Sequence, residues 1–253
     1  MPQKRSQALV LAVRDFSEAD CLVTFLTPAA GRVTAVAKHA RKSKRRFMNC
    51  LEPFSLVEFL YTEKPQQELA RLESGELLEA FRGLRRSLLP LACAAVLTET
   101  TGELVGAEDR LPAIYATLKN SLDYLATGQS PWSLFLSHLL RLVAQTGFGP
   151  QWQSCRHCGQ ADGGLVWFNP EQGGVLCQGC VSRAPGPRLY PLHLGSRKLI
   201  LAAQHLPLQH LARLRFPELA RQETLAIMQP FVRQIIGREL RAWGFLEKIL
   251  PYV

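Results

Sequence analysis

Residues 155–180 read CRHCGQADGGLVWFNPEQGGVLCQGC, and this stretch decides how its part of the chain folds. It holds two Cys-x2-Cys pairs separated by eighteen residues: Cys155 and Cys158, then Cys177 and Cys180. Paired thiols at this spacing are typical of a tetrahedral Zn²⁺ site. Between the pairs, residues 163–164 open a turn, residues 165–168 favour a strand, and residues 169–174 are dense in turn formers. We therefore predict a zinc-ribbon hairpin that holds one Zn²⁺ ion.

The ligand type favours a structural zinc ion over a catalytic one. Four thiolates fill a tetrahedron, whereas a catalytic zinc keeps one position open for water or substrate. His157 lies inside the first pair, and we expect it to be a solvated bystander. Redox chemistry of the thioredoxin kind would need a Cys-x2-Cys pair beside a βαβ pattern, and no such pattern is visible. The His-x-Glu element of zinc deaminases is also absent.

The first 80 residues have the pattern of a small β barrel. Short apolar or alternating runs at residues 8–13, 21–26, 32–38, 54–61 and 68–74 are separated by turn-forming residues. In the third run, alternate residues share one face, as in a strand that is buried on one side. Five such strands suit a small closed barrel, and the OB-fold is a five-stranded example.

From Arg85 onward the apolar residues recur with helical spacing. Residues 88–105 form one predicted helix, and a stripe between residues 111 and 125 forms another. Ser130-Pro131 begins a third helix, and the clearest helix near the C-terminus covers residues 228–236. The fold class that we expect is therefore α+β and multidomain, with a five-stranded OB-fold barrel followed by a helical domain into which a four-cysteine zinc ribbon is inserted.

We expect four segments along the chain. They are a nucleic-acid-binding OB-fold domain at residues 1–80, the first part of a helical domain at 81–152, the zinc module at 153–183, and the C-terminal part of the helical domain at 184–253.

A basic segment lies between the third and fourth predicted strands. No acidic residue occurs between Asp20 and Glu52, and six of the nine residues from Lys38 to Arg46 are cationic. Like charges packed this closely repel one another unless a polyanion neutralises them, which favours binding to nucleic-acid phosphates without base-specific readout. A merely solvated loop is the alternative. The candidate nucleic-acid contacts are Arg32, Lys38, His39, Arg41, Lys42, Lys44, Arg45 and Arg46. The flanking Phe47 and Phe54 could stack on bases, but we expect them to be packed.

The overall composition narrows the class of protein. The formal net charge is +9, and residues 151–253 carry 12 basic against 6 acidic side chains. No secretory signal and no apolar run of membrane-spanning length is present, so we expect no membrane partner. The scattered Cys21, Cys50 and Cys93 suit buried thiols in a reducing cytosol. Phosphate-loop, His-Glu-x2-His and Gly-x-Ser-x-Gly motifs are absent, so we expect no enzyme.

Several short stretches, taken in order, resemble the bacterial recombination mediator family RecO. These stretches are ARKSKRRF at 40–47, LEPF at 51–54, ELARL at 68–72, ELL at 76–78 and TGFGP at 146–150. The resemblance implies a non-catalytic DNA-repair protein, cytoplasmic and nucleoid-associated, that binds single- and double-stranded DNA and anneals complementary strands. It further implies that RecR and the C-terminal tail of single-stranded DNA-binding protein are partners, and that RecA is loaded onto coated single strands. By position, the basic segment would contact DNA phosphates, and Arg141 would edge the groove that receives the tail.

Two other functions stay open at the level of sequence. A barrel combined with a zinc ribbon also serves RNA-binding or translation-associated proteins. A protein-binding adaptor could use the same basic segment to attract acidic partner tails.

Overall fold

The computed structural model of the protein describes residues 3–43, 45–63, 68–106, 112–161, 163–183 and 188–250. The chain forms two compact units, Met1–Thr127 and Gly128–Val253. Each unit combines β-strands with α-helices, which confirms the predicted α+β class. The four predicted segments are a different division of the chain and stay a prediction.

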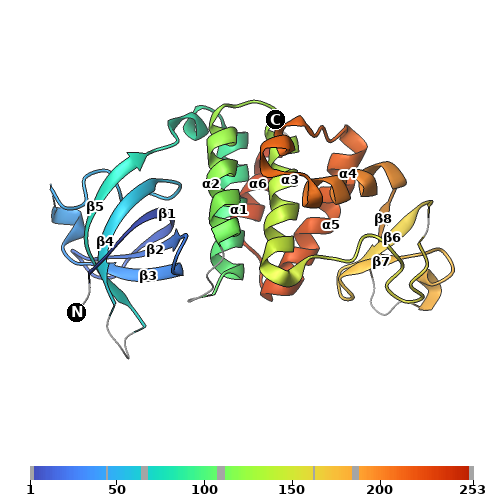
Figure 1. Ribbon diagram of the computed structural model, residues 1–253, viewed down its shortest axis with the longest axis horizontal. Helices are drawn as coiled ribbons and strands as arrows, with labels where there is room; N and C mark the ends of the chain where they lie inside the picture. The colour runs from blue at the N-terminus through green and yellow to red at the C-terminus, as the bar shows by residue number, and fades with distance from the viewer. Residues whose placement is uncertain are drawn as a thin grey trace. The chain divides into compact units, whose positions relative to one another are not determined.

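The first unit contains a closed five-stranded barrel, which confirms the predicted OB-like architecture (Figure 1). Its strands are β1 (Gln3–Asp15), β2 (Cys21–Thr27), β3 (Gly31–Ala37), β4 (Leu56–Thr62) and β5 (Ala70–Glu79). They follow the order β1-β2-β3-β5-β4, and β1 pairs with both β2 and β4. Only the pairing of β3 with β5 is parallel. That pairing completes the ring of strands and leaves the barrel without a free edge.

The barrel core follows from the alternation of the strands. Val33, Ala35 and Ala37 are buried while the residues between them are half-buried, as the sequence pattern predicts. The ring of Phe25 meets the rings of Phe59 and Tyr61, with centroids 4.9 and 5.5 Å apart. Burying one such aromatic side chain contributes about 1.5–3 kcal/mol, so the barrel has an apolar centre of its own.

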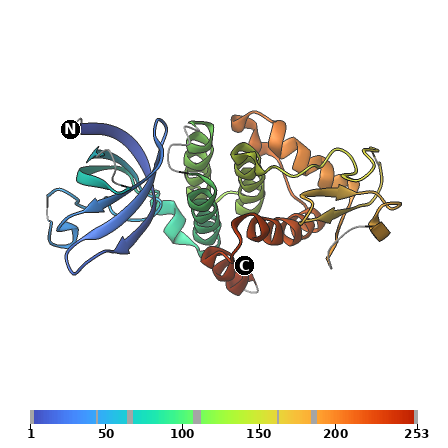
Figure 2. The ribbon, with the colours of Figure 1, turned by 90° about the horizontal axis from the view of Figure 1, so that it is seen from below.

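Two helices complete the first unit. After η1 (Ala40–Lys42) and η2 (Arg82–Arg86), the chain forms α1 (Leu88–Leu104) and α2 (Pro112–Ala126). The helix α1 packs on α2 and on strands β1 and β2 (Figure 2). The guanidinium group of Arg32 on β3 donates a hydrogen bond of 2.9 Å to the carbonyl oxygen of Gly102. A cation at this end of a helix satisfies a free carbonyl and complements the helix dipole, so Arg32 stabilises the contact between barrel and helix.

The second unit combines a helical bundle with a small sheet. Its helices are α3 (Pro131–Val143), α4 (Leu194–His205), α5 (Glu218–Ile236) and α6 (Arg241–Ile249), with the short turns η3 (Ala144–Phe148), η4 (Val181–Arg183) and η5 (Leu208–Arg213). The strands β6 (Val166–Asn169), β7 (Gly174–Leu176) and β8 (Tyr190–Leu192) form a sheet in the order β7-β6-β8. The helix α3 contacts α4 and α5, and the ring of Phe135 on α3 meets that of Trp243 on α6. This arrangement confirms a helical C-terminal part with an inserted four-cysteine segment.

A single glycine on β5 allows the barrel core to pack. A Cβ atom at Gly75 would lie 2.6 Å from Phe59 Cε1 and 2.9 Å from Cys50 Sγ. Both of these neighbours are fully buried, so the core around them must shift to admit the new atom. We expect Gly75→Ala to lower the free energy of unfolding by roughly 1–3 kcal/mol through overpacking, as measured by urea denaturation.

The matched control is Gly102→Ala in α1. The nearest atom to its new Cβ is Leu11 Cδ1 at 3.7 Å, an ordinary contact. Because alanine favours helix more than glycine does, this variant should keep the wild-type stability or gain up to about 1 kcal/mol. Equal losses in the two variants would show that overpacking is not the reason for the effect at Gly75.

Candidate metal centre and candidate nucleic-acid interface

Each cysteine pair is held by a tight backbone turn. In the first pair, the Gly159 N–H donates to the carbonyl oxygen of Cys155 over 2.8 Å, and the Cys155 N–H donates to that of Gln160 over 2.9 Å. Gly159 has a φ of 73°, in the left-handed region that glycine adopts without strain. In the second pair, which follows β7 directly, the Cys180 N–H donates to the carbonyl oxygen of Cys177 over 3.0 Å. Each turn brings its two sulfur atoms to the same side of the chain.

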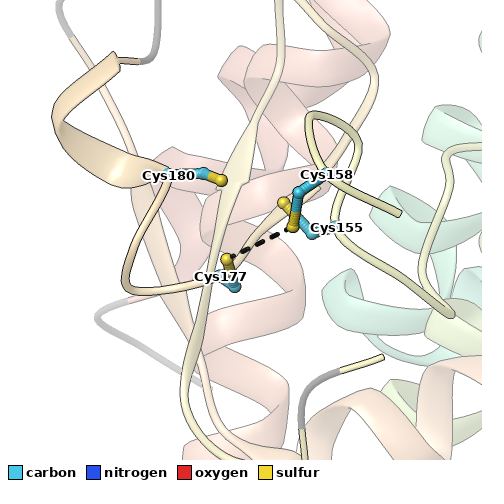
Figure 3. Close-up of side chains that lie close together, drawn as sticks. All are labelled: Cys155, Cys158, Cys177 and Cys180. Carbon is cyan, nitrogen blue, oxygen red and sulfur yellow. Dashed lines mark hydrogen bonds between the residues drawn. The ribbon is translucent and has the colours of Figure 1, made fainter. Parts of the chain in front are cut away.

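The four sulfur atoms converge on one point (Figure 3). All four Sγ atoms lie within 4.8 Å of one another, and those of Cys158 and Cys177 are 3.8 Å apart. A tetrahedral zinc ion with Zn–S bonds of about 2.3 Å requires its sulfur ligands to be about 3.8 Å apart. The spacing therefore fits a ZnS₄ centre, and the four predicted ligands form a cluster that could hold a metal ion. His157 is exposed and does not belong to the cluster.

The electrostatics of the cluster also suit a divalent cation. Burial raises the pKa of the Cys155 thiol, but N–H groups of Cys158, Cys177 and His157 outweigh this and lower it to about 6. Burial and the neighbouring sulfur groups raise the pKa of Cys180 to about 12. One thiolate is thus favoured, while four thiolates together would repel one another. A bound cation would remove that repulsion, and four soft sulfur donors in a tetrahedral arrangement suit a metal such as zinc.

Aromatic packing joins the cysteine hairpin to the helices of the second unit. The ring of Trp152 stacks on Phe168 of β6 at a centroid distance of 4.9 Å, and Phe168 meets Phe231 of α5 edge-on at 5.5 Å. Strand β8 pairs with β6, and the His193 side chain that follows it is paired with Glu223 of α5. The cysteine cluster therefore belongs to a hairpin whose packing is continuous with the helices of the second unit.

The predicted basic segment leaves β3 and is tied to the loop between β1 and β2. Its first turn, η1, buries Ala40 against the barrel core. The His39 N–H donates to a carboxylate oxygen of Asp20 over 2.8 Å, and the side chain of Arg41 forms an ion pair with Asp15. The N–H of His39 is the largest reason why the pKa of Asp20 is below its usual value. These contacts give the start of the segment a defined backbone.

The predicted nucleic-acid contacts fall into two groups. Lys38, Lys42 and Arg45 are exposed, and within the described residues no hydrogen bond or ion pair holds their cationic groups. The guanidinium groups of Arg32 and Arg46 form hydrogen bonds within the fold. Arg46 donates to the carbonyl oxygen of Lys38 over 2.6 Å, and its guanidinium lies 5.1 Å from the ring centroid of Phe47.

The remaining predicted contacts, and the two flanking phenylalanines, take different places. His39 and Arg41 are exposed beside the loop between β1 and β2, while Lys44 lies outside the described residues. Phe47 is buried, as expected, and Phe54 is half-buried in a turn with a φ of 71°. The role of all eight predicted contacts in binding stays a prediction.

Arg141, predicted to edge a tail-binding groove, lies on α3. Its guanidinium donates to the carbonyl oxygen of Leu206, directly after the last residue of α4. This contact fastens α4 to α3, and the side chain is half-buried. A role in binding a protein tail stays a prediction.

Sequence reasoning did not identify a hollow beside the basic segment. The exposed Phe16, together with Lys38 and Arg71, lines this hollow, which has a volume of about 570 Å³. The one sequence feature that could have indicated this hollow is a large aromatic residue, Phe16, in the mainly polar turn at residues 14–20.

Comparisons with known proteins cover almost the whole chain. Residues 1–81 match the family described as Recombination protein O N terminal, and residues 85–244 match Recombination protein O C terminal. Proteins named DNA repair protein RecO are similar over nearly their full length. One from Anaeromyxobacter sp. (strain Fw109-5) is 34% identical over 96% of this chain and 95% of its own length. One from Syntrophobacter fumaroxidans is 33% identical over 98% of both chains, and one from Syntrophus aciditrophicus is 28% identical over 97% and 95%.

The sulfur geometry predicts one tightly bound zinc ion per chain. We expect elemental analysis of protein purified without added zinc to find about one equivalent, and Cys155→Ser to lose it, because three thiolates leave the tetrahedron open. The loss should destabilise the second unit by several kcal/mol, since binding of structural zinc contributes directly to folding. Cys21→Ser, which changes a thiol of the barrel core, should keep the metal. Protein without zinc at full stability would contradict a structural ion.

Zinc binding should depend on pH in a defined direction. Metal ligands must be thiolates, and the raised pKa of Cys180 keeps that group protonated in the absence of metal. Binding should therefore release protons, and the affinity should fall as the pH is lowered from about 8 to about 6. Calorimetry in buffers of different ionisation enthalpy measures the proton release. An affinity that does not change with pH would contradict thiolate ligation.

Proposed function

Because the chain belongs to the recombination protein O family of DNA repair proteins, we propose that it is a non-catalytic recombination mediator that binds single- and double-stranded DNA and promotes strand annealing. The proposal includes the finer family role, in which the protein acts with RecR, contacts the C-terminal tail of single-stranded DNA-binding protein, and helps to load RecA onto coated DNA. The observation that carries it is the exposed cationic side chains that the described part of the basic segment presents beside a closed five-stranded barrel.

The exposed cations of that segment support phosphate binding. Lys38, Lys42 and Arg45 present charges to solvent from a backbone that the carboxylate of Asp20 and the guanidinium of Arg46 help to hold. A cationic surface of this kind releases counterions when it binds a phosphate backbone, and this supplies sequence-independent affinity. Small barrels with a cationic surface of this kind commonly bind single strands along the phosphate backbone.

Annealing requires no catalytic residue under this proposal. Two phosphate backbones repel each other, and a cationic surface that binds both lowers the electrostatic barrier to pairing.

A zinc ion bound by all four cysteines would have no open position for a substrate, which supports a structural role for zinc in the second unit. None of the described helices is long and apolar enough to span a membrane. The family and the basic surface together favour the bacterial cytoplasm and nucleoid as the site of action.

The exposed cations should determine the salt dependence of DNA binding. We expect the double variant Lys42→Gln/Arg45→Gln to bind a single-stranded oligonucleotide more weakly. The slope of log affinity against log salt should become shallower by about 1.4, because each lost phosphate contact on a single strand contributes about 0.7. Fluorescence anisotropy across a salt series measures both quantities.

A variant with the same loss of charge elsewhere in the first unit is the control. Arg82→Gln/Arg86→Gln removes two exposed cations outside the basic segment and should leave the slope unchanged. If the two variants behave alike, net charge alone accounts for binding and the basic segment has no special role. If neither variant changes the slope, the segment does not contact DNA.

The mediator role is tested by annealing on coated DNA. Complementary strands covered with their single-stranded DNA-binding protein should anneal faster with this protein than without it, and the rate should change further when RecR is added. Parallel affinities for single-stranded DNA, duplex DNA and RNA at one salt concentration separate this function from an RNA-binding one. A preference for RNA without any annealing of coated DNA would contradict the proposal.

A further inference from the structure

A hollow on the outside of the barrel lies beside the basic segment. It has a volume of about 570 Å³, within the range of about 300–1,000 Å³ that is typical of small-ligand sites. Three parts of the barrel contribute to it: the loop between β1 and β2, the end of β3 with the residue after it, and the start of β5 with the two residues before it. Its apolar lining comes mainly from Phe16, Val36 and Leu69, and its charged lining from Lys38, Glu68 and Arg71.

Phe16 is an unusual member of this lining. The residue is 54% exposed, and the other four members of its five-residue loop, at positions 17–20, are small or acidic. Single exposed apolar residues are common on protein surfaces and need no explanation by themselves. Here the ring opens onto a hollow that has cations on its border, and this combination points to a ligand with both a flat apolar face and negative charge.

The loop that carries Phe16 is already held in place. The N–H groups of Phe16 and Ser17 donate to the carbonyl oxygen of Asp20 over 3.0 and 3.3 Å. The Asp20 carboxylate accepts the N–H of His39, and the N–H of Arg41 donates to the carbonyl oxygen of Ala19 over 3.3 Å. The loop between β1 and β2 and the start of the basic segment therefore form one hydrogen-bonded structure. A loop whose backbone is fixed in this way loses little freedom when a ligand packs on it.

Two cationic side chains, Lys38 and Arg71, border the hollow and could contact the phosphates on either side of a bound base. Arg71 is paired with Val36 in the parallel β3–β5 ladder, and Lys38 follows the last residue of β3. Both side chains are exposed, and Arg71 also has Glu73 at 3.2 Å. Glu68 repels phosphate, and as a hydrogen-bond acceptor it suits the amino groups of a base edge. In OB-folds, the β2–β3 face and the loops after β1 and β4 form the usual ligand surface, and the hollow lies on that surface.

We propose that this hollow receives an unpaired nucleobase of a single-stranded nucleic acid, which stacks on the ring of Phe16 while Lys38 and Arg71 contact the flanking phosphates. The inference deepens the proposed function and rests on it. It adds a contact that a base buried in a duplex is unable to make, because its faces are covered by its neighbours. The basic segment then binds any phosphate backbone, and Phe16 discriminates single strands from duplexes.

The test compares Phe16→Ala with the wild type on a fluorescein-labelled oligonucleotide and on the duplex that it forms with its complement. Loss of one stacked base should weaken single-strand binding between about fivefold and a hundredfold. Duplex affinity should change by less than about twofold, since the phosphate contacts remain. Phe16→Trp should restore single-strand binding, because any large aromatic face supports stacking. An RNA oligonucleotide of the same sequence shows whether the stacked base comes from DNA, from RNA or from both.

Leu78→Ala is the matched control, since it removes an exposed apolar side chain from β5 outside the hollow. It should change neither affinity. The stacking inference is overturned if Phe16→Ala binds single strands as the wild type does, if it loses duplex and single-strand affinity equally, or if Phe16→Trp is as weak as Phe16→Ala. If Lys42→Gln/Arg45→Gln weakens binding while Phe16→Ala does not, the stacking inference fails and the proposed function stands. If neither variant weakens binding, both fail.

Discussion

The parallel pairing of β3 with β5 is the constraint on which the first unit depends. Its register covers only three residue pairs, from Ala35 with Ala70 to Ala37 with Leu72, yet it closes the barrel. Without it, β3 and β5 would each present a free edge, and the strands would form an open sheet. Closure also decides which surface residues become neighbours. Arg71 comes beside Val36, and Lys38 and Phe16 come to border the same hollow, although these residues are far apart in sequence.

In the second unit, the cluster of four cysteine sulfur atoms is the corresponding constraint, because its spacing fits a single metal ion. Around the sulfur atoms the hairpin buries few apolar residues, and the local cluster there consists of Leu176 and three cysteines, with Val181 and Leu189 packed against it. Four thiolate ligands on one ion can hold such a segment together where hydrophobic burial is insufficient. The stacked rings of Trp152 and Phe168 then connect the hairpin to Phe231 of α5. The ion would stabilise the hairpin, and the aromatic contacts would hold the stabilised hairpin against the helices of the second unit.

Local patterns predicted the elements of this fold well, because periodicity and spacing depend on neighbours in sequence. The alternation in β3, the apolar run that became α1 and the cysteine spacing are of this kind. Long-range contacts could not be predicted in the same way. Arg32 is a candidate phosphate contact because it is a cation in an acid-free stretch, whereas its hydrogen bond to Gly102, seventy residues away, has no local sequence signal. Phe16 was overlooked because a loop residue becomes part of a binding surface only after the barrel closes around it.

The distribution of charge in the basic segment explains how so many cations can be kept close together. Asp15 at the end of β1 and Asp20 in the loop that follows it each accept a contact from the segment, so part of its repulsion is offset within the fold. The ion pair of Arg41 with Asp15 is exposed and therefore weak, and a phosphate can replace the carboxylate at little cost. Arg46 is directed toward the Lys38 carbonyl and the Phe47 ring, where it orders the backbone. Nucleic acid would therefore meet a surface whose described backbone is already shaped, and the free energy of phosphate contact would not be consumed in ordering that part of the segment.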